Sequence, residues 1–177
     1  MNQVLQSLKE RRSVRSYKPD MVPMELINEV VEAGTYAASA MGLQPAIIVA
    51  VTDKATRDKL SKMNREVMGV PFDPFYGAPV VLIVLADKKN PNYLYDGSLV
   101  MGNLLNAAHA VGLGSCWIHR AREEFESAEG KALLKEWGIE GDYEGIGHCI
   151  LGYIDGQVPA AAPRKANYVY HVDGAKK

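Results

Sequence analysis

Two apolar runs rich in β-branched residues constrain the fold of this chain more than any other feature. The first is PAIIVAVTD at residues 45–53, and the second is VVLIVLAD at residues 80–87. Runs of this length that end at a polar residue are typical of strands covered on both faces. We therefore expect the first run to be a central strand and the second to be another buried strand.

Segments with helical spacing of apolar residues lie around these runs. The alternation of the two kinds of segment favours a single α+β domain over residues 1–177. We expect the helices to pack on one mainly antiparallel or mixed sheet. The expected helices cover residues 4–11, 23–34, 56–64, 97–111 and 129–137, and short strands are expected within 112–119 and at 148–154.

The composition is that of a mildly acidic globular protein. Of the 177 residues, 47% are hydrophobic, which suits a single core. There are 20 Lys and Arg against 21 Asp and Glu, which gives a formal net charge of -1. Because nucleic-acid-binding proteins usually carry a positive surplus, this balance argues against nucleic acid as a partner.

Neither the N-terminus nor any apolar stretch indicates export or membrane insertion. MNQVLQSLKERR lacks the apolar core of a signal peptide, and the longest apolar helical candidate, residues 99–111, is shorter than the roughly 20 residues that span a bilayer. Cys116 and Cys149 lie far apart without metal-ligand spacing, so we expect no metal site. The expectation is a cytoplasmic protein with reduced thiols.

The segment at 97–111 is apolar around nearly its whole circumference, and Asp96 is placed to cap its first turn. A helix of this kind must be buried on all sides. One small domain can hardly cover it, so we expect a second copy of the chain to complete its surroundings. The predicted assembly is a homodimer.

Three arginines lie within five residues in the stretch RRSVRSY, residues 11–17. Arg11 and Arg12 at the end of a helix complement its negative terminus, worth about 0.3–1 kcal/mol each, which explains two of the three. In an extended segment, however, Arg11, Ser13 and Arg15 project to one side, and two guanidinium groups with a hydroxyl between them suit a phosphate. The residues alone leave both alternatives open.

A second cationic element, Arg164 and Lys165, follows a proline-containing tract near the other end of the chain. Alone it is typical of a solvated tail. It becomes informative only together with the cluster at residues 11–15.

The order and spacing of several motifs along nearly the whole chain resemble the nitroreductase-like flavoproteins, which are FMN-dependent homodimers with an α+β fold. The motifs are RRSVRSY, ASAMGLQPA, GAPVVLIVLAD, DGSLVMGNLLNAAHAVGLGSCWIHR, ILGY and PRK. The resemblance implies a nitroreductase-like fold assembled as a domain-swapped-type homodimer. It also implies FMN as the cofactor and NADH or NADPH as the electron donor.

Three groups of FMN-binding residues follow from the resemblance. RRSVRSY and the C-terminal basic residues would bind the phosphate and ribityl chain, ASAMGLQPA would reach the flavin of the partner subunit, and GLGSCWIH would pass beside the isoalloxazine ring. The residues assigned in this way are Arg11, Arg12, Ser13, Arg15, Arg164 and Lys165, then Ser39, Ala40, Met41 and Gln44, then Gly114, Ser115, Trp117, Ile118 and His119. Core packing is the alternative for Trp117 and Ile118, and a polar surface position for His119.

The loop ASAMGLQPA departs from the family pattern Pro-Ser-x-x-Asn-x-Gln-Pro-Trp at three positions. Ala38, Gly42 and Ala46 replace the Pro, the Asn and the aromatic residue. Gly42 cannot make the side-chain hydrogen bond of an Asn, and without the resemblance it is simply a turn residue.

The implied function is an FMN-dependent oxidoreductase in which reduced nicotinamide and a nitroaromatic, quinone or similar planar acceptor react in turn, by a ping-pong hydride mechanism. No catalytic side chain is required, because the flavin carries the chemistry. Another flavin chemistry, such as dehalogenation, flavin fragmentation or azoline oxidation, and a non-catalytic FMN-binding protein are the alternatives. The candidates for stacking on the acceptor are Phe72, Phe75 and Tyr76, and we expect at least one of them to pack in the core instead.

Overall fold

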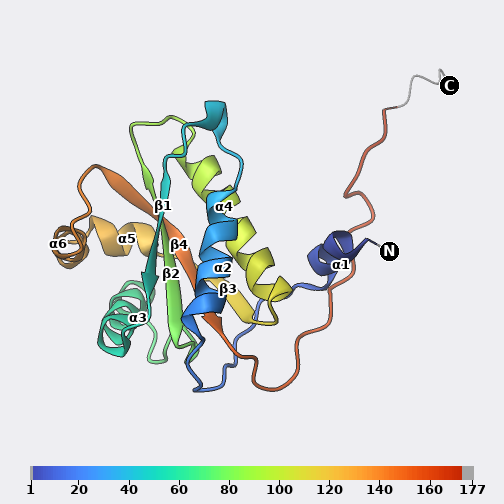
Figure 1. The fold of residues 1–177 in the computed structure, drawn as a ribbon, viewed down its shortest axis with the longest axis horizontal. Helices are drawn as coiled ribbons and strands as arrows, with labels where there is room; N and C mark the ends of the chain where they lie inside the picture. The colour runs from blue at the N-terminus through green and yellow to red at the C-terminus, as the bar shows by residue number, and fades with distance from the viewer. Residues whose placement is uncertain (1, 173–177) are drawn as a thin grey trace.

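A four-stranded antiparallel sheet forms the centre of the molecule (Figure 1). The computed structural model describes residues 2–172. The strands are β1 (Ala46–Val51), β2 (Val80–Asp87), β3 (Gly114–Ile118) and β4 (Tyr143–Gly152). Their order across the sheet is β1-β2-β4-β3, and each neighbouring pair is antiparallel, in agreement with the predicted mainly antiparallel sheet.

Side chains that alternate along β2 supply two separate apolar cores. Val81 and Ile83 belong to the core on one face of the sheet, and Leu82 and Val84 to the core on the other. None of the four has exposed surface. Because strand side chains alternate with period two, a continuous apolar run fills both faces, and each such side chain contributes roughly 1.5–3 kcal/mol. The run at 80–87 is confirmed as a buried strand.

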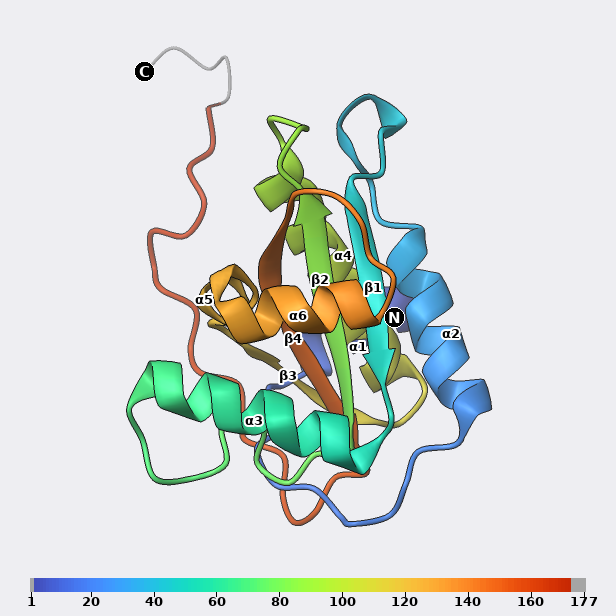
Figure 2. The same cartoon turned by 90° about the vertical axis from the view of Figure 1, so that its left-hand side faces the viewer.

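Helices cover both faces of the sheet and give three layers (Figures 1 and 2). One face carries α2 (Met24–Thr35) and α4 (Tyr93–Ala110), and the other carries α3 (Lys54–Met68), α5 (Ala121–Glu126) and α6 (Ala128–Glu136). The short helix α1 (Gln3–Glu10) and the turn η1 (Ala40–Gly42) lie outside these layers.

Local sequence specifies the ends of α3. Asp53 accepts a hydrogen bond from the N–H of Thr56 at 2.8 Å, and Gly69 ends the helix with φ 71°. A capping carboxylate supplies a partner for an unpaired first-turn N–H, and glycine adopts the left-handed conformation without steric cost. These two residues extend α3 beyond the predicted range 56–64 at both ends.

Several elements differ from the sequence prediction. Among the described residues β1 has one neighbouring strand, β2, and is an edge strand rather than a central one. Its side chains are mostly half-buried, so an apolar run of this length does not distinguish an edge from a centre. The helix expected at 97–111 begins about one turn earlier, which places Asp96 inside α4 rather than at its N-cap. In addition, α5 precedes the helix predicted at 129–137 and was not expected.

Two glycines explain why the last strand is longer than predicted. A Cβ on Gly145 would lie 2.2 Å from the carbonyl oxygen of Ala121, and a Cβ on Gly147 would lie 2.1 Å from Nε1 of Trp117. Only glycine allows α5 and Trp117 to approach the strand this closely. These glycines interrupt the apolar pattern, so the sequence predicted a start at residue 148 whereas β4 begins at Tyr143.

Two expectations about environment concern the described residues. None of the helices within residues 2–172 combines the length and apolar character needed to cross a membrane. Cys116 and Cys149 are free and buried, one in each core, so they do not pair with each other. Burial raises the pKa of the Cys149 thiol, which keeps it protonated.

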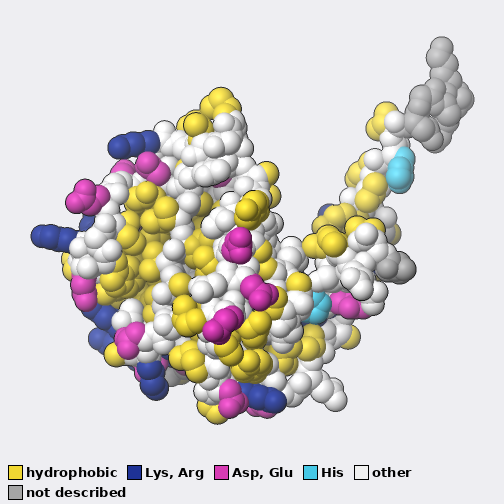
Figure 3. Space-filling view, viewed as in Figure 1, with side chains coloured by type: hydrophobic (Ala, Val, Ile, Leu, Met, Phe, Trp, Pro, Cys, Tyr) yellow, Lys and Arg dark blue, Asp and Glu magenta, His cyan; other side chains and the backbone are white. Residues whose placement is uncertain are grey.

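Parts of the surface are apolar and uncovered in the single chain. In α4, Leu104 is fully buried, whereas Leu99 is 50% exposed and Tyr95 is 72% exposed. The prediction that this helix is buried all round is therefore not met by one chain. No residue of α1 is buried, and residues 155–172 are exposed throughout. Figure 3 shows apolar side chains on α1 and along this tail.

Candidate functional site

A cavity of about 580 Å³ lies between the end of α1 and the C-terminal tail. Arg11 and Arg12 line it from the α1 side, and Arg164 lines it from the tail. The structure therefore brings together the two cationic elements from opposite ends of the chain. The other lining residues are Leu8, Lys9, Ala161 and Ala162.

The chain itself satisfies only part of these guanidinium groups. Nη1 of Arg12 donates to the carbonyl oxygens of Lys9 and Arg11 at 2.6 and 2.7 Å, so the helix-end interpretation is confirmed for Arg12. Nη2 of Arg164 donates to the carbonyl oxygen of Ala162 at 2.6 Å. Nη1 of Arg11 and Nε of Arg12 are buried, and neither has an acceptor among the described residues. Because unpaired buried donors cost free energy, this cavity favours an anion.

The segment that follows the arginines runs along the free edge of β3. Ser13 forms a parallel bridge with Ser115, and the N–H of Val14 donates to the carbonyl oxygen of Ser115 at 2.9 Å. Val14 is buried and Arg15 is exposed, as side-chain alternation in an extended segment predicts. Arg15 and Lys165 do not line the cavity between α1 and the tail, the basic cavity, so their assigned roles remain predictions.

The residues predicted to lie beside the flavin ring occupy β3 and the turn after it. Gly114, Ser115 and Ile118 are buried, and core packing is confirmed for Ile118. The rings of Trp117 and His119 lie 5.5 Å apart, with His119 exposed. Nε1 of Trp117 is buried without an acceptor in the described part of the chain. Contact of these residues with a flavin remains a prediction.

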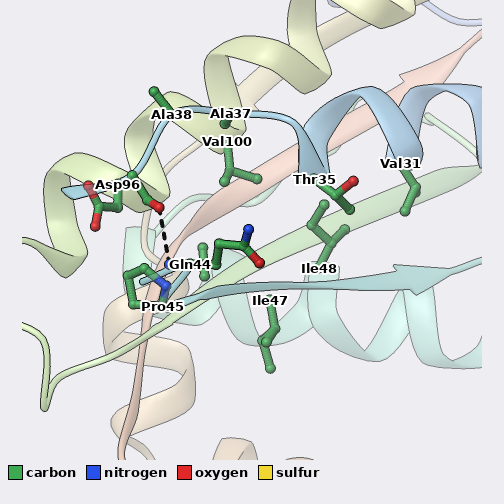
Figure 4. A pocket seen from close by; sticks show the side chains of 12 residues that line it. Val31, Thr35, Ala37, Ala38, Gln44, Pro45, Ile47, Ile48, Asp96 and Val100 are labelled. Carbon is green, nitrogen blue, oxygen red and sulfur yellow. Dashed lines mark hydrogen bonds between the residues drawn. The ribbon is translucent and has the colours of Figure 1, made fainter. Parts of the chain in front are cut away.

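A second cavity, of about 300 Å³, lies between α2, β1 and α4 (Figure 4). Ser39 and Gln44 line it, and Figure 4 shows the Gln44 side chain extending into it. Met41, Gly42 and Gln44 adopt left-handed backbone conformations, with φ of 52°, 68° and 49°. Oγ of Ser39 accepts from the N–H of Gln44 at 3.1 Å and closes the turn. Gly42 thus serves as a turn residue in this loop.

Asp96 joins the loop at residues 39–44 to α4 through a hydrogen bond. Its Oδ1 accepts from the N–H of Ala40 at 3.1 Å, and the residue is 4% exposed. The N-cap role predicted for Asp96 is wrong, because α4 begins at Tyr93 and the carboxylate is used in a long-range contact.

Hydrogen bonds from Arg57 and Ser61 join the aromatic loop at residues 70–79 to α3. Asp73 accepts hydrogen bonds from Ser61 Oγ at 2.6 Å and from two backbone N–H groups of the loop at 2.8 and 2.9 Å. Arg57 donates to Asp73 at 2.5 Å and to the carbonyl oxygen of Ala78 at 2.9 Å. Burial raises the pKa of Asp73, but the hydrogen bonds from Ser61, Arg57 and the backbone outweigh burial and hold this pKa below its usual range.

This attachment changes the interpretation of the three aromatic candidates. Phe75 has no exposed surface, its ring centre lies 5.2 Å from that of His148, and the Arg57 guanidinium lies 5.5 Å above it. Phe75 is therefore a core residue, and its ring is not available to stack on an acceptor. Phe72 is 45% exposed and lies 6.3 Å from the half-buried Tyr76. These two remain candidates.

Sequence reasoning missed two polar residues near the end of β3. Asn64 is fully buried in α3 and contacts the turn at residues 119–120. Helical spacing puts Asn64 on the same face as Leu60 and Met63, so a polar residue at a predicted core position was the available signal. Arg120 adopts φ 77°, for which the sequence carries no signal.

A family profile and individual relatives both match this chain. The profile of the Nitroreductase family matches residues 8–153. A relative from Archaeoglobus fulgidus is 32% identical over 159 residues, which is 86% of each chain. The FMN reductase (NAD(P)H) of Bacillus subtilis is 34% identical over 144 residues, covering 69% of this chain. The matched segment spans 56% of that protein and 59% of a relative from Methanothermobacter thermautotrophicus.

Solved structures agree on the fold. A nitroreductase with bound FMN from Bacteroides fragilis superposes with a TM-score of 0.90 and 27% identity, over 98% of this chain and 100% of that one. An FMN-dependent nitroreductase from Clostridium difficile gives a TM-score of 0.81 and 27% identity, over 98% and 99% of the two chains. The predicted nitroreductase-like fold is confirmed.

Replacing Asp73 with Ala should release the aromatic loop from α3. We expect the free energy of unfolding to fall by about 1.5–3 kcal/mol, because hydrogen bonds to a charged group are lost, as measured by urea unfolding at pH 7. The pKa of Asp73 is lowered in the folded state, so its contribution is fully present above the ordinary pKa and is lost as the pH falls through the folded value. The difference in the free energy of unfolding between the wild type and the variant should therefore become smaller below about pH 4.

The exposed Asp20 provides a matched control. Asp20→Ala should leave stability within about 0.5 kcal/mol of the wild type. An Asp73→Ala protein as stable as the Asp20→Ala protein would contradict the proposed anchoring of the loop.

Proposed function

Because this chain belongs to the nitroreductase family, we propose that it is an FMN-dependent oxidoreductase. Reduced nicotinamide, NADH or NADPH, is the electron donor, and a nitroaromatic, quinone or similar planar compound is the acceptor. The observation that carries the proposal is the convergence of Arg11, Arg12 and Arg164 on one cavity.

The basic cavity suits the phosphate of FMN. A phosphate monoester carries about -1.5 to -2 charges at pH 7 and accepts paired hydrogen bonds from guanidinium groups. Nη1 of Arg11 and Nε of Arg12 are buried donors without an acceptor among the described residues. The chain has a net charge of -1, so these cations are a local feature and do not reflect a basic surface. One small anion satisfies this arrangement better than a polyanion.

The contact between residues 13–14 and Ser115 joins the cavity to β3. Ser13 would hold the ribityl chain, and the adjoining residues of β3, with Trp117 and His119 at its end, would hold the ring. FMN, when bound, supplies hydride and electron transfer between the two substrates. The residues of the chain bind and orient the ring, and the exposed Arg15 beside β3 is the candidate for stabilising the negative charge that reduction adds.

A homodimer accounts for the surfaces that one chain leaves uncovered. Figure 1 shows η1 at one end of the molecule, with α1 and the tail projecting to one side, so the loop at 39–44 lies away from the basic cavity of its own chain. Within residues 2–172, one face of α4 is exposed, no residue of α1 is buried, and the tail is exposed throughout. A second copy that exchanges tails would cover them and bring the loop of one chain to the flavin of the other.

Rapid mixing tests the activity. FMN-loaded protein mixed with NADH or NADPH should lose its flavin absorbance, and a second mixing with a quinone or nitroaromatic should restore it. Because the two substrates use the same ring in turn, double-reciprocal plots should be parallel. A protein that holds FMN stoichiometrically but is reduced by neither nucleotide would be a flavin-binding protein without turnover, against the proposal.

Arg164→Ala tests the phosphate site. Loss of a charged hydrogen bond should weaken FMN binding by about 1.5–3 kcal/mol, whereas riboflavin, which lacks the phosphate, should bind nearly as well as before. Titration of the apo-protein with both ligands by fluorescence quenching measures the two affinities. Lys18→Ala, an exposed cation outside the cavity lining, is the control and should change neither. Equal losses for FMN and riboflavin would place Arg164 away from the phosphate.

Leu99→Glu tests the assembly. Leu99 is half exposed in the single chain, so a charge there should prevent association while the chain stays folded. Sedimentation should show a folded species near 19.4 kDa that has lost its flavin. Leu104→Glu should instead unfold the chain, because Leu104 is fully buried within it. A Leu99→Glu monomer that retained stoichiometric FMN would argue against a site shared between two chains.

A further inference from the structure

A buried polar network connects α3 to the end of β3. Its centre is Asn64, which has no exposed surface. Nδ2 of Asn64 donates to the carbonyl oxygen of His119 at 2.7 Å and to Oε1 of Glu124. Oδ1 of Asn64 accepts from Nε of Arg120 at 3.1 Å. A side-chain amide offers two donor hydrogens and one acceptor oxygen, and all of them are engaged here.

The network continues into the centre of the sheet. Oε2 of Glu124 lies 3.3 Å from Nε2 of His148 in β4, and both side chains are fully shielded from solvent. A buried carboxylate without partners is strongly destabilising, so Glu124 depends on the hydrogen bond that Asn64 donates to its Oε1, because its Oε2 has no hydrogen-bond donor among the described residues. Asn64 is therefore linked to the sheet through Glu124, which lies against His148 of β4.

The turn that Asn64 holds has an unfavourable backbone conformation. Arg120 adopts φ 77°, in the left-handed region that a residue other than glycine occupies only at a cost in free energy. Such a conformation persists only when the surroundings enforce it. Asn64 bonds to the carbonyl before this residue and to its side chain, and the Arg120 carbonyl oxygen accepts from the N–H of Glu124 at 3.0 Å.

Peptide geometry then determines where the next donor points. The described chain contains no cis peptide bond. In a planar trans peptide the C=O and N–H groups point in opposite directions, so a His119 carbonyl turned into the core toward α3 directs the N–H of Arg120 away from it. His119 is exposed, and its ring lies beside Trp117 at the end of β3. The Arg120 N–H therefore points away from α3 at the end of β3, where the proposed function would place the flavin ring.

We propose that Asn64 is a positioning residue for the flavin. It fixes the peptide between His119 and Arg120 so that its N–H donates to an electron-rich nitrogen or carbonyl oxygen of the isoalloxazine ring. The inference rests on the proposed function. Because reduction adds negative charge to the ring, this hydrogen bond stabilises the reduced flavin more than the oxidised flavin.

The test compares Asn64→Leu with Asn103→Leu in the FMN-loaded protein. Asn103 is the control, because it is also a helical Asn whose Nδ2 donates to a backbone carbonyl oxygen, that of Ala33 at 3.0 Å, but it is half-buried and joins α4 to α2. Asn64→Leu should lower the midpoint potential of the flavin and weaken the reduced form about tenfold more than the oxidised form, the size expected for one hydrogen bond to a group that gains charge. Asn103→Leu should lower the melting temperature without moving the potential.

Three outcomes would overturn the proposal. An unchanged midpoint potential of the flavin in Asn64→Leu would show that the turn makes no hydrogen bond to the flavin that depends on Asn64. Equal shifts in both variants would show a general effect of destabilisation. A wild-type protein that binds no FMN would remove the proposed function itself, which distinguishes that failure from failure of the role of Asn64.

A measurement on the unmodified protein covers the case in which Asn64→Leu does not fold. The Arg120 amide should shift in the ¹H–¹⁵N spectrum when FMN is added, and its hydrogen exchange should slow at least tenfold. The amide of the exposed Gly112, before β3, is the internal reference and should change little. An Arg120 amide that neither shifts nor becomes protected on FMN binding would overturn the proposal.

Discussion

Burial of β2 on both faces is the constraint on which the rest of this structure depends. A strand whose alternate side chains fill two cores requires helices on each side, and α4 and α3 supply them. The loops that carry the candidate site residues leave these layers at their ends. Asp96 of α4 holds the loop at 39–44, while Arg57 of α3 holds the aromatic loop. The central strand thus positions the site indirectly, through the helices packed on it.

The two segments that line the basic cavity differ in how firmly the rest of the chain holds them. The segment at 11–15 is tied to β3 through Ser115, and its Val14 is buried in the core. The tail that brings Arg164 has no buried residue from 155 to 172. Ordering such a tail costs conformational entropy, which contacts with a second chain and with a bound anion would offset. Cofactor binding and assembly would then depend on the same segment.

Sequence periodicity predicted helices packed on one mainly antiparallel or mixed sheet, and physical reasons explain where the prediction of individual elements failed. The run at 80–87 and the helix after Pro23 were predicted correctly because their apolar spacing has one structural solution. The convergence of Arg11 and Arg164 could be suggested only by the family resemblance, since no local pattern relates residues so far apart. The expectation that at least one of the three aromatics packs in the core is met by Phe75, but local sequence could not single it out, because its contacts come from Arg57 of α3 and His148 of β4. Asp96 was predicted to be a cap because its long-range partner, Ala40, is invisible to local spacing.

Arg57, Ser61 and Asn64 recur at intervals of four and three residues, so they occupy one face of α3. The first two hold the aromatic loop, and the third holds the turn after β3. One face of a single helix therefore holds both loops. Neither loop can swing outward without breaking charged hydrogen bonds or dragging the helix with it. Any breathing motion at this end of the protein should accordingly be concerted, with both loops displaced together as one rigid body.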